Sequence, residues 1–178
     1  MKDIRLGIVG LGRLGSIHAE NILNKIKGGK LIAACSLNNN ELIQIKNRVN
    51  RIKCYNDFNK MINTCQLDGV IIVSSSDQHC KHSMIALKKG LHVFCEKPLG
   101  TNLNECLKIK KLVNSQQDLI FMLGFMRRYD PSYIYLKKKV DEGLIGTPIL
   151  FRSYSVDPES LISNSIKYAK NSGGQFLD

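Results

Sequence analysis

Short apolar runs alternate with amphipathic stretches along most of this chain. The runs that we expect to form strands lie at residues 4–9, 31–35, 52–55, 70–73, 92–95 and 119–123. Between them, apolar residues recur at helical spacing at residues 13–26, 41–49, 58–64, 79–89 and 103–113. Nearly continuous apolar runs are typical of strands that are covered on both faces. Their alternation with helices predicts an α/β fold with a Rossmann-type doubly wound parallel sheet.

The pattern changes after residue 124. We expect a helix over residues 131–142 and then a longer strand over residues 147–156, which we interpret as the first strand of an α+β layer. The last residues, 173–178, begin with a Gly-Gly pair and resemble the entry to another helix. The sequence therefore predicts one domain over residues 1–124 and the start of a second, incomplete domain over residues 125–178.

A glycine-rich segment separates the first expected strand from the first expected helix. In such a segment Gly10 permits a tight turn, Gly12 lets the backbone approach a diphosphate, and Gly15 lets the helix pack closely on the sheet. The unpaired N–H groups and the positive dipole end of the helix favour the diphosphate anion. We therefore predict that a nicotinamide dinucleotide is bound by Gly10, Gly12, Arg13, Leu14 and Gly15.

The end of the second expected strand bears on the choice between NAD and NADP. An acid usually binds the ribose of NAD there, but this chain has Ser36, and its first acid is Glu41. The Ser36 hydroxyl can hydrogen-bond a ribose hydroxyl or a 2′-phosphate, and no arginine follows to favour NADP. We expect NAD as the cofactor, with NADP as the alternative.

The chain is basic, with a formal net charge of +11 and a pI of about 9.5, which makes nucleic acid a partner to consider. The longest basic run, at residues 137–139, is short, and the other lysines are scattered among asparagines and isoleucines. We interpret the charge as a solvated surface that would attract an anionic dinucleotide. No nucleic-acid partner is expected.

The six cysteines include no CxxC pair, and several fall in apolar runs, which indicates buried reduced thiols and no metal site. The start of the chain does not resemble a signal peptide. The apolar run at residues 70–73 is too short to cross a membrane. We expect a cytoplasmic protein with no membrane partner.

The fifth expected strand ends in Phe-Cys-Glu-Lys-Pro-Leu, residues 94–99, at the edge where open α/β sheets bind ligands. Together with the glycine loop, this segment resembles the sequence motifs of the glucose–fructose oxidoreductase / inositol dehydrogenase / rhizopine-catabolism family. Two further matches are Gly-Ser-Ile-His-Ala-Glu-Asn at residues 15–21 and Gly-Phe-Met-Arg-Arg-Tyr-Asp at residues 124–130. Within that family the chain is most similar to the inositol 2-dehydrogenases, over essentially its whole length. The resemblance implies hydride transfer from a ring hydroxyl carbon of a cyclitol or sugar, such as myo-inositol, to nicotinamide.

The resemblance also implies roles for individual residues. Lys97 is expected at the substrate oxygen, where a cation favours the alkoxide that forms as hydride leaves. Asp178 matches the aspartate that orients the reacting hydroxyl, and Arg127 and Met126 are expected to bind the substrate. The remaining cofactor contacts implied are Ser36, Ser74, Ser75, His79, Glu96 and Lys97 itself. Ser75 stands where the family usually has proline, so this loop is expected to be less rigid.

The resemblance further implies that residues 1–124 are the dinucleotide-binding domain and that residues 125–178 begin the substrate and dimerisation domain, which is expected to be incomplete. The general-base histidine is expected four residues after Asp178, and an open sheet that closes the site and forms the interface of homo-oligomers should follow. Two hypotheses remain open at this stage. One is an NAD(P)-dependent inositol-type dehydrogenase seen as a truncated chain, and the other is a non-catalytic NAD(P)-binding sensor or gene remnant.

Overall fold

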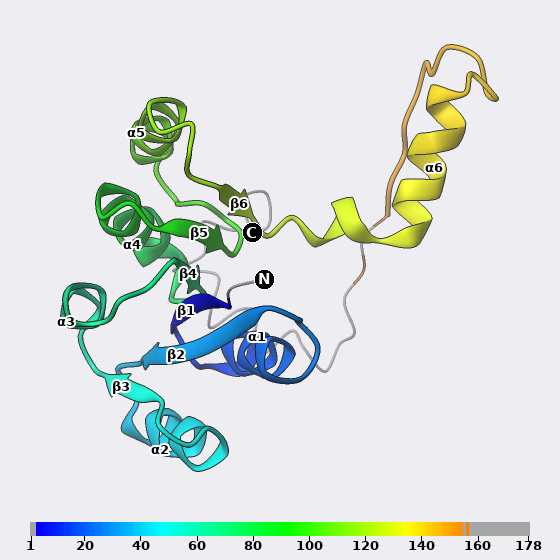
Figure 1. Ribbon diagram of the computed structural model, residues 1–178. Coiled ribbons are helices and arrows are strands. Elements are labelled where there is room, and N and C mark those ends of the chain that lie inside the picture. The colour runs from blue at the N-terminus through cyan, green and yellow to red at the C-terminus, as the bar shows by residue number, and fades with distance from the viewer. Residues whose placement is uncertain (1–2, 155, 157–178) are drawn as a thin grey trace.

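The computed structural model describes residues 3–154 and 156, and its centre is a six-stranded parallel sheet (Figure 1). The strands are β1 (Ile4–Val9), β2 (Gly29–Cys35), β3 (Lys53–Tyr55), β4 (Gly69–Ile72), β5 (His92–Cys95) and β6 (Phe121–Leu123). Their order is β3-β2-β1-β4-β5-β6, which reverses direction between β1 and β4. Ligands bind at such a reversal, beyond the carboxyl ends of the strands. The predicted doubly wound fold is confirmed.

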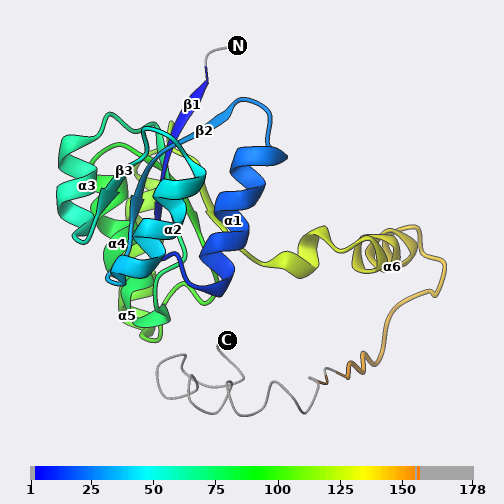
Figure 2. The same cartoon turned by 90° about the horizontal axis from the view of Figure 1, so that it is seen from below.

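Helices cover both faces of the sheet (Figure 2). On one face lie α1 (Arg13–Asn24) and α2 (Asn39–Arg48), and on the other lie α3 (Phe58–Thr64), α4 (Ser76–Lys88) and α5 (Leu103–Asn114). Among the helices described, none combines the length and the apolar character that a membrane span requires.

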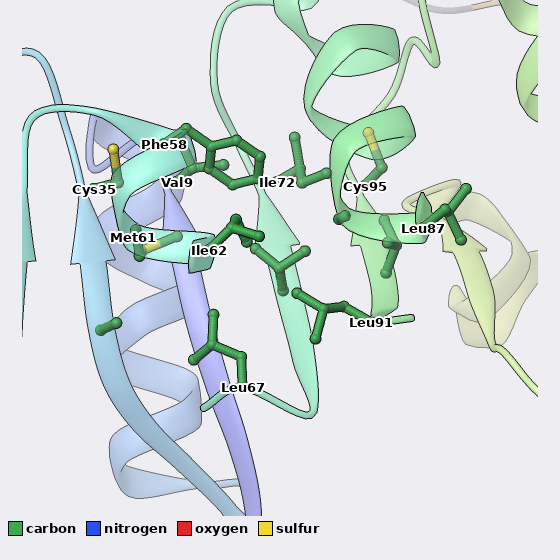
Figure 3. Close-up of a cluster of buried hydrophobic side chains, with 14 of the residues drawn as sticks. Val9, Cys35, Phe58, Met61, Ile62, Leu67, Ile72, Leu87, Leu91 and Cys95 are labelled. Carbon is green, nitrogen blue, oxygen red and sulfur yellow. The ribbon is translucent and has the colours of Figure 1, made fainter. Parts of the chain in front are cut away.

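A buried apolar cluster joins the sheet to α3, α4 and α5 (Figure 3). Val9 and Ile72 contribute from the strands, and Met61 and Leu87, both fully buried, contribute from the helices. Burial of side chains of this size stabilises the fold by roughly 1.5–3 kcal/mol each. A second cluster on the opposite face, which includes Ile8, packs β1 and β2 against α1 and α2. The loops at the carboxyl ends of the strands are therefore carried by a well-packed base.

Three of these helices begin with a side-chain cap, whereas α1 and α4 do not. The side chains of Asn38, Asp57 and Asn102 each accept a backbone N–H from the first turn of α2, α3 and α5. The N-cap of α1 is Gly12, no side chain caps it, and its first turn contains no acid. The backbone N–H groups at the start of α1 therefore remain available to a bound anion.

After β6 the chain leaves the sheet and forms a 3-10 turn, η1 (Met126–Tyr129), and helix α6 (Pro131–Asp141), neither of which has a buried residue (Figures 1 and 2). The strand predicted over residues 147–156 is wrong for the part that is described, since residues 147–154 and 156 form no strand. A strand requires a hydrogen-bonded neighbour. The exposed fractions of Ile149 and Val156, 98% and 87%, show that this run packs against nothing in the described chain.

Candidate nucleotide site at the carboxyl edge of the sheet

The glycine loop between β1 and α1 requires glycine at its first and last positions for the fold itself. Gly10 has a φ of +86°, and a Cβ there would lie 2.3 Å from the carbonyl oxygen of Val73. A Cβ at Gly15 would lie 2.0 Å from the carbonyl oxygen of Gly10. The loop is therefore folded tightly on itself and on the end of β4.

Gly12 differs from these two glycines because the fold does not require it. It is exposed, its φ is −59°, and the nearest heavy atom to an added Cβ is Glu41 Oε1 at 4.0 Å. A side chain at this position would occupy open space beside the uncapped start of α1. The absence of a side chain thus leaves the backbone open to a ligand, which is the arrangement that a diphosphate needs. The side chains of Arg13 and Leu14, which follow, are also exposed.

Ser36 lies at the end of β2 with an exposed fraction of only 7%. Its hydroxyl donates to Glu41 Oε2 at 2.6 Å and accepts the backbone N–H of Asn38 at 3.0 Å. The Ser36 side chain is therefore engaged within the protein. The structure instead brings the carboxylate of Glu41, from the first turn of α2, to the end of β2.

The segment after β4 contains the predicted contacts Ser74 and Ser75, and here α4 begins earlier than expected, at Ser76, with Ser75 as its N-cap. His79 consequently lies inside the first turns of α4, with an exposed fraction of 2%. Its ring nitrogens lie 2.8 Å from the Ser74 carbonyl oxygen and 2.7 Å from that of Pro98. The His79 ring thus ties the loop after β4 to the segment after β5, and it is buried below the surface that a ligand would reach.

A second histidine fixes the Ser74 side chain. His82 Nδ1 lies 3.0 Å from Ser74 Oγ, and its ring packs on Phe58 at 4.4 Å between centroids. Burial, with smaller contributions from Lys81 and His79, lowers the pKa of His82 to about 4. At neutral pH the ring is therefore uncharged.

Glu96 and Lys97 follow β5, and the Glu96 carboxylate is engaged inside the protein. Its Oε1 lies 2.8 Å from His18 Nε2 on α1, and its Oε2 accepts the backbone N–H of Lys97 at 3.2 Å. A Cβ at Gly124, after β6, would lie 2.9 Å from the same carboxylate. Burial acts to raise the pKa of Glu96, but the hydrogen bonds and charges of His18 and Lys97 together lower it. Glu96 thus positions the backbone of Lys97 relative to α1.

The two residues predicted to bind substrate, Met126 and Arg127, lie in η1 and are exposed. Arg127 pairs with Asp130 at 3.2 Å, and its guanidinium lies 5.5 Å from the centroid of the Tyr133 ring. These contacts are local to η1 and α6 and do not reach the ends of the strands. Asp178, the other predicted catalytic residue, lies outside the described residues.

The side chains of the described chain offer no alternative metal centre. No group of three or more potential metal ligands occurs among the residues described. All six thiols are unpaired, and burial raises the pKa of Cys80 and of Cys95 to about 12. Cys80 and Cys95 are therefore poor nucleophiles at neutral pH, and we assign them to packing.

Comparison with known proteins agrees with this geometry. Residues 4–125 match the model of a family described as "Oxidoreductase family, NAD-binding Rossmann fold". The chain belongs to this family. Myo-inositol 2-dehydrogenase of Thermotoga maritima is 36% identical over 177 residues, which cover 98% of this chain and 51% of that protein. The chain spans about half the length of the relatives it matches.

Two solved structures of family members extend the comparison. Myo-inositol 2-dehydrogenase of Lactobacillus plantarum superposes with a TM-score of 0.94 at 45% identity, over 99% of this chain and 53% of that one. Scyllo-inositol dehydrogenase of Lactobacillus casei, with bound cofactor NAD(H) and scyllo-inositol, gives a TM-score of 0.93 at 45% identity over the same shares. The family resemblance drawn from the glycine loop and the Glu-Lys-Pro segment is confirmed.

The roles of two residues of the site, Glu41 and His18, escaped the sequence reasoning. Glu41 lies five residues beyond Ser36, and only the fold of α2 returns its carboxylate to that serine. His18 and Glu96 are separated by 78 residues, so no local pattern pairs them. The signal that could have found Glu41 is that it is the first acid after the second strand.

Proposed function

We propose that this chain is the cofactor-binding part of an NAD-dependent dehydrogenase that oxidises a ring hydroxyl of a cyclitol such as scyllo- or myo-inositol. The observation that carries the proposal is the conjunction of an open Gly12 backbone and an uncapped α1 with the Lys97 segment at the same edge of the sheet. The relatives named above, of which this chain covers about half, support the cyclitol substrate.

The binding step depends on the backbone of the glycine loop. Gly10 and Gly15 keep the loop compact, and Gly12 exposes the backbone and the start of α1 to the diphosphate. Arg13 and Leu14 flank this surface with exposed side chains. When bound, NAD supplies the nicotinamide ring that accepts the hydride.

The chemical step needs a positive charge at the substrate oxygen. As the carbon–hydrogen bond breaks and the hydroxyl proton is lost, negative charge builds on that oxygen, and the Lys97 ammonium stabilises it. Glu96 and His79 hold the backbone on either side of Lys97 through its amide and through the Pro98 carbonyl. The hydroxyl proton must go to a base, which the family pattern places at a histidine four residues after Asp178, and on the same ground we assign Asp178 to orient that hydroxyl. Arg127 and Met126 are assigned to the substrate on the same ground.

The remaining parts of the proposal concern the setting of the protein. We assign it to the cytoplasm, where thiols stay reduced, and the six unpaired cysteines support this. We expect homo-oligomers of the whole protein and no nucleic-acid partner. The division into domains at residue 124 also remains a prediction, supported by the departure of the chain from the sheet after β6 (Figure 1).

The test is to fuse this chain to the C-terminal half of the Thermotoga maritima relative and to follow NAD reduction at 340 nm with scyllo- and myo-inositol. We expect inositol-dependent reduction, and we expect Lys97→Ala to lower the rate at least about hundredfold. Lys108→Ala, on the exposed surface of α5, serves as the matched lysine control. If the fusion protein binds NAD but shows no inositol-dependent NAD reduction, the result would favour the hypothesis of a non-catalytic NAD(P)-binding protein. Activity that survives Lys97→Ala would remove Lys97 from the chemistry.

A further inference from the structure

We infer that Glu41, held in place by Ser36, is the acid that binds the adenosine ribose and makes the site selective for NAD over NADP. The inference rests on the proposed function and assigns its cofactor preference to one side chain. It also replaces Ser36, the ribose contact expected at the end of β2. The acid that is expected at the end of that strand is instead supplied from helix α2.

The contacts of Ser36 make it a support for Glu41 and not the group that meets the ligand. The Ser36 hydroxyl donates its proton to Glu41 Oε2 at 2.6 Å, and it accepts the Asn38 N–H at 3.0 Å. With an exposed fraction of 7%, the serine lies beneath the surface. Both of its hydrogen-bonding functions are therefore used to hold the carboxylate and the start of α2.

A purely structural role for Glu41 would be a capping box, in which a glutamate at the third helical position accepts the N–H of the N-cap residue. Asn38 is the N-cap of α2 and Glu41 is at that third position. However, the Asn38 N–H is already bonded to Ser36 Oγ at 3.0 Å. Glu41 therefore does not make the capping contact, and its carboxylate accepts a hydrogen bond from Ser36 instead.

The other carboxylate oxygen, Oε1, faces the glycine loop. It is the nearest heavy atom, at 4.0 Å, to the Cβ position at Gly12, the glycine whose missing side chain leaves the backbone open. Within the described chain no donor is hydrogen-bonded to Oε1, and Glu41 is partly exposed. A ligand whose diphosphate lies on Gly12 therefore places its adjoining ribose beside this oxygen.

The chemistry of a carboxylate at this place favours one cofactor. Its oxygens accept hydrogen bonds from the vicinal hydroxyls of an unmodified ribose. A 2′-phosphate would bring about two negative charges next to the carboxylate, and like charges brought together oppose binding. A neutral serine alone provides no such repulsion.

The experiment is titration calorimetry of the full chain with NAD⁺ and NADP⁺, and with AMP and adenosine 2′,5′-bisphosphate as probes that carry only the adenosine ribose. We expect the unmodified chain to prefer NAD⁺ and AMP. Glu41→Gln should weaken NAD⁺ binding by about tenfold or more and reduce the preference over NADP⁺. Ser36→Ala should shift the preference in the same direction by a smaller factor. Glu105→Gln is the matched control, because it lies at the same third position of a helix with an asparagine N-cap.

The outcomes separate this inference from the proposed function. A chain that binds neither dinucleotide contradicts the proposed function as a whole. If the unmodified chain binds NAD⁺, and Glu41→Gln changes the ratio of NAD⁺ to NADP⁺ affinities no more than Glu105→Gln does, the Glu41 assignment alone is overturned. Should Glu41→Gln unfold, Glu41→Asp, which keeps the charge, must retain the NAD⁺ preference, and loss of that preference overturns the assignment.

Discussion

His18 Nε2 lies 2.8 Å from Glu96 Oε1, and this contact joins the helix that carries the glycine loop to the segment that carries Lys97. The two side chains are largely buried, with exposed fractions of 23% and 13%. This hydrogen bond therefore links the cofactor-binding element to the proposed catalytic element.

Removal of His18 should leave the Glu96 carboxylate without its hydrogen-bond partner on α1. We expect His18→Ala to lower the free energy of unfolding by about 1–3 kcal/mol, part of it from the lost ring contact with Phe94. Urea unfolding of the two single variants and of the double variant with Glu96→Gln measures the coupling, which should exceed about 0.5 kcal/mol. Additive effects of the two substitutions would show that the interaction between His18 and Glu96 contributes nothing to the free energy of unfolding.

The glycine loop gives a sharp contrast between neighbouring positions. A Cβ at Gly15 would lie 2.0 Å from a backbone carbonyl oxygen, which cannot move aside like the end of a side chain. We expect Gly15→Ala to cost about 3 kcal/mol or more, whereas Gly12→Ala should cost less than about 1 kcal/mol. Thermal unfolding of both variants tests this, and equal melting temperatures would contradict the described packing of α1.

Titration of His82 should make stability fall on mild acidification. Its pKa is about 4 in the folded protein and 6.5 in the unfolded chain, so the unfolded chain binds more protons between these values. The free energy of unfolding should therefore decrease as pH falls from 6.5 toward 4, by up to about 3 kcal/mol. Below about pH 4.5 Glu96 adds to the effect, because its pKa is lowered in the folded protein.

The control for this pH dependence is His82→Phe, which keeps an aromatic ring next to Phe58 but cannot take up a proton. Denaturant unfolding between pH 4.5 and 7 should show a shallower slope in the variant than in the unmodified chain. The same slope in both proteins would mean that groups other than His82 dominate the titration.

The sequence predicted most of the fold because the relevant signals are local. The apolar runs of the strands and the Gly10–Gly15 segment lie within single elements, so spacing alone located the sheet and the loop. The strand expected over residues 147–156 was wrong in its described part, because a strand depends on a partner that local pattern does not supply.

The site was predicted less completely than the fold, for a similar reason. Lys97 and Gly12 could be located by motif, but the surroundings that define their chemistry come from distant segments. Glu41 reaches the end of β2 because α2 starts at Asn39. There the Ser36 hydroxyl donates a hydrogen bond to the Glu41 carboxylate. Hydrogen-bond partners of this kind follow from the packing of whole elements, which the sequence pattern does not specify.

The most direct test of the account is the binding of NAD⁺ to Gly12→Val, measured by titration calorimetry alongside a melting curve. An added Cβ at Gly12 meets no atom closer than 4.0 Å, so the variant should fold with a loss of about 1 kcal/mol or less. It should nevertheless bind NAD⁺ at least about hundredfold more weakly, because the side chain occupies the approach to the backbone. A folded variant that binds NAD⁺ as tightly as the unmodified chain would contradict the placement of the diphosphate on this loop.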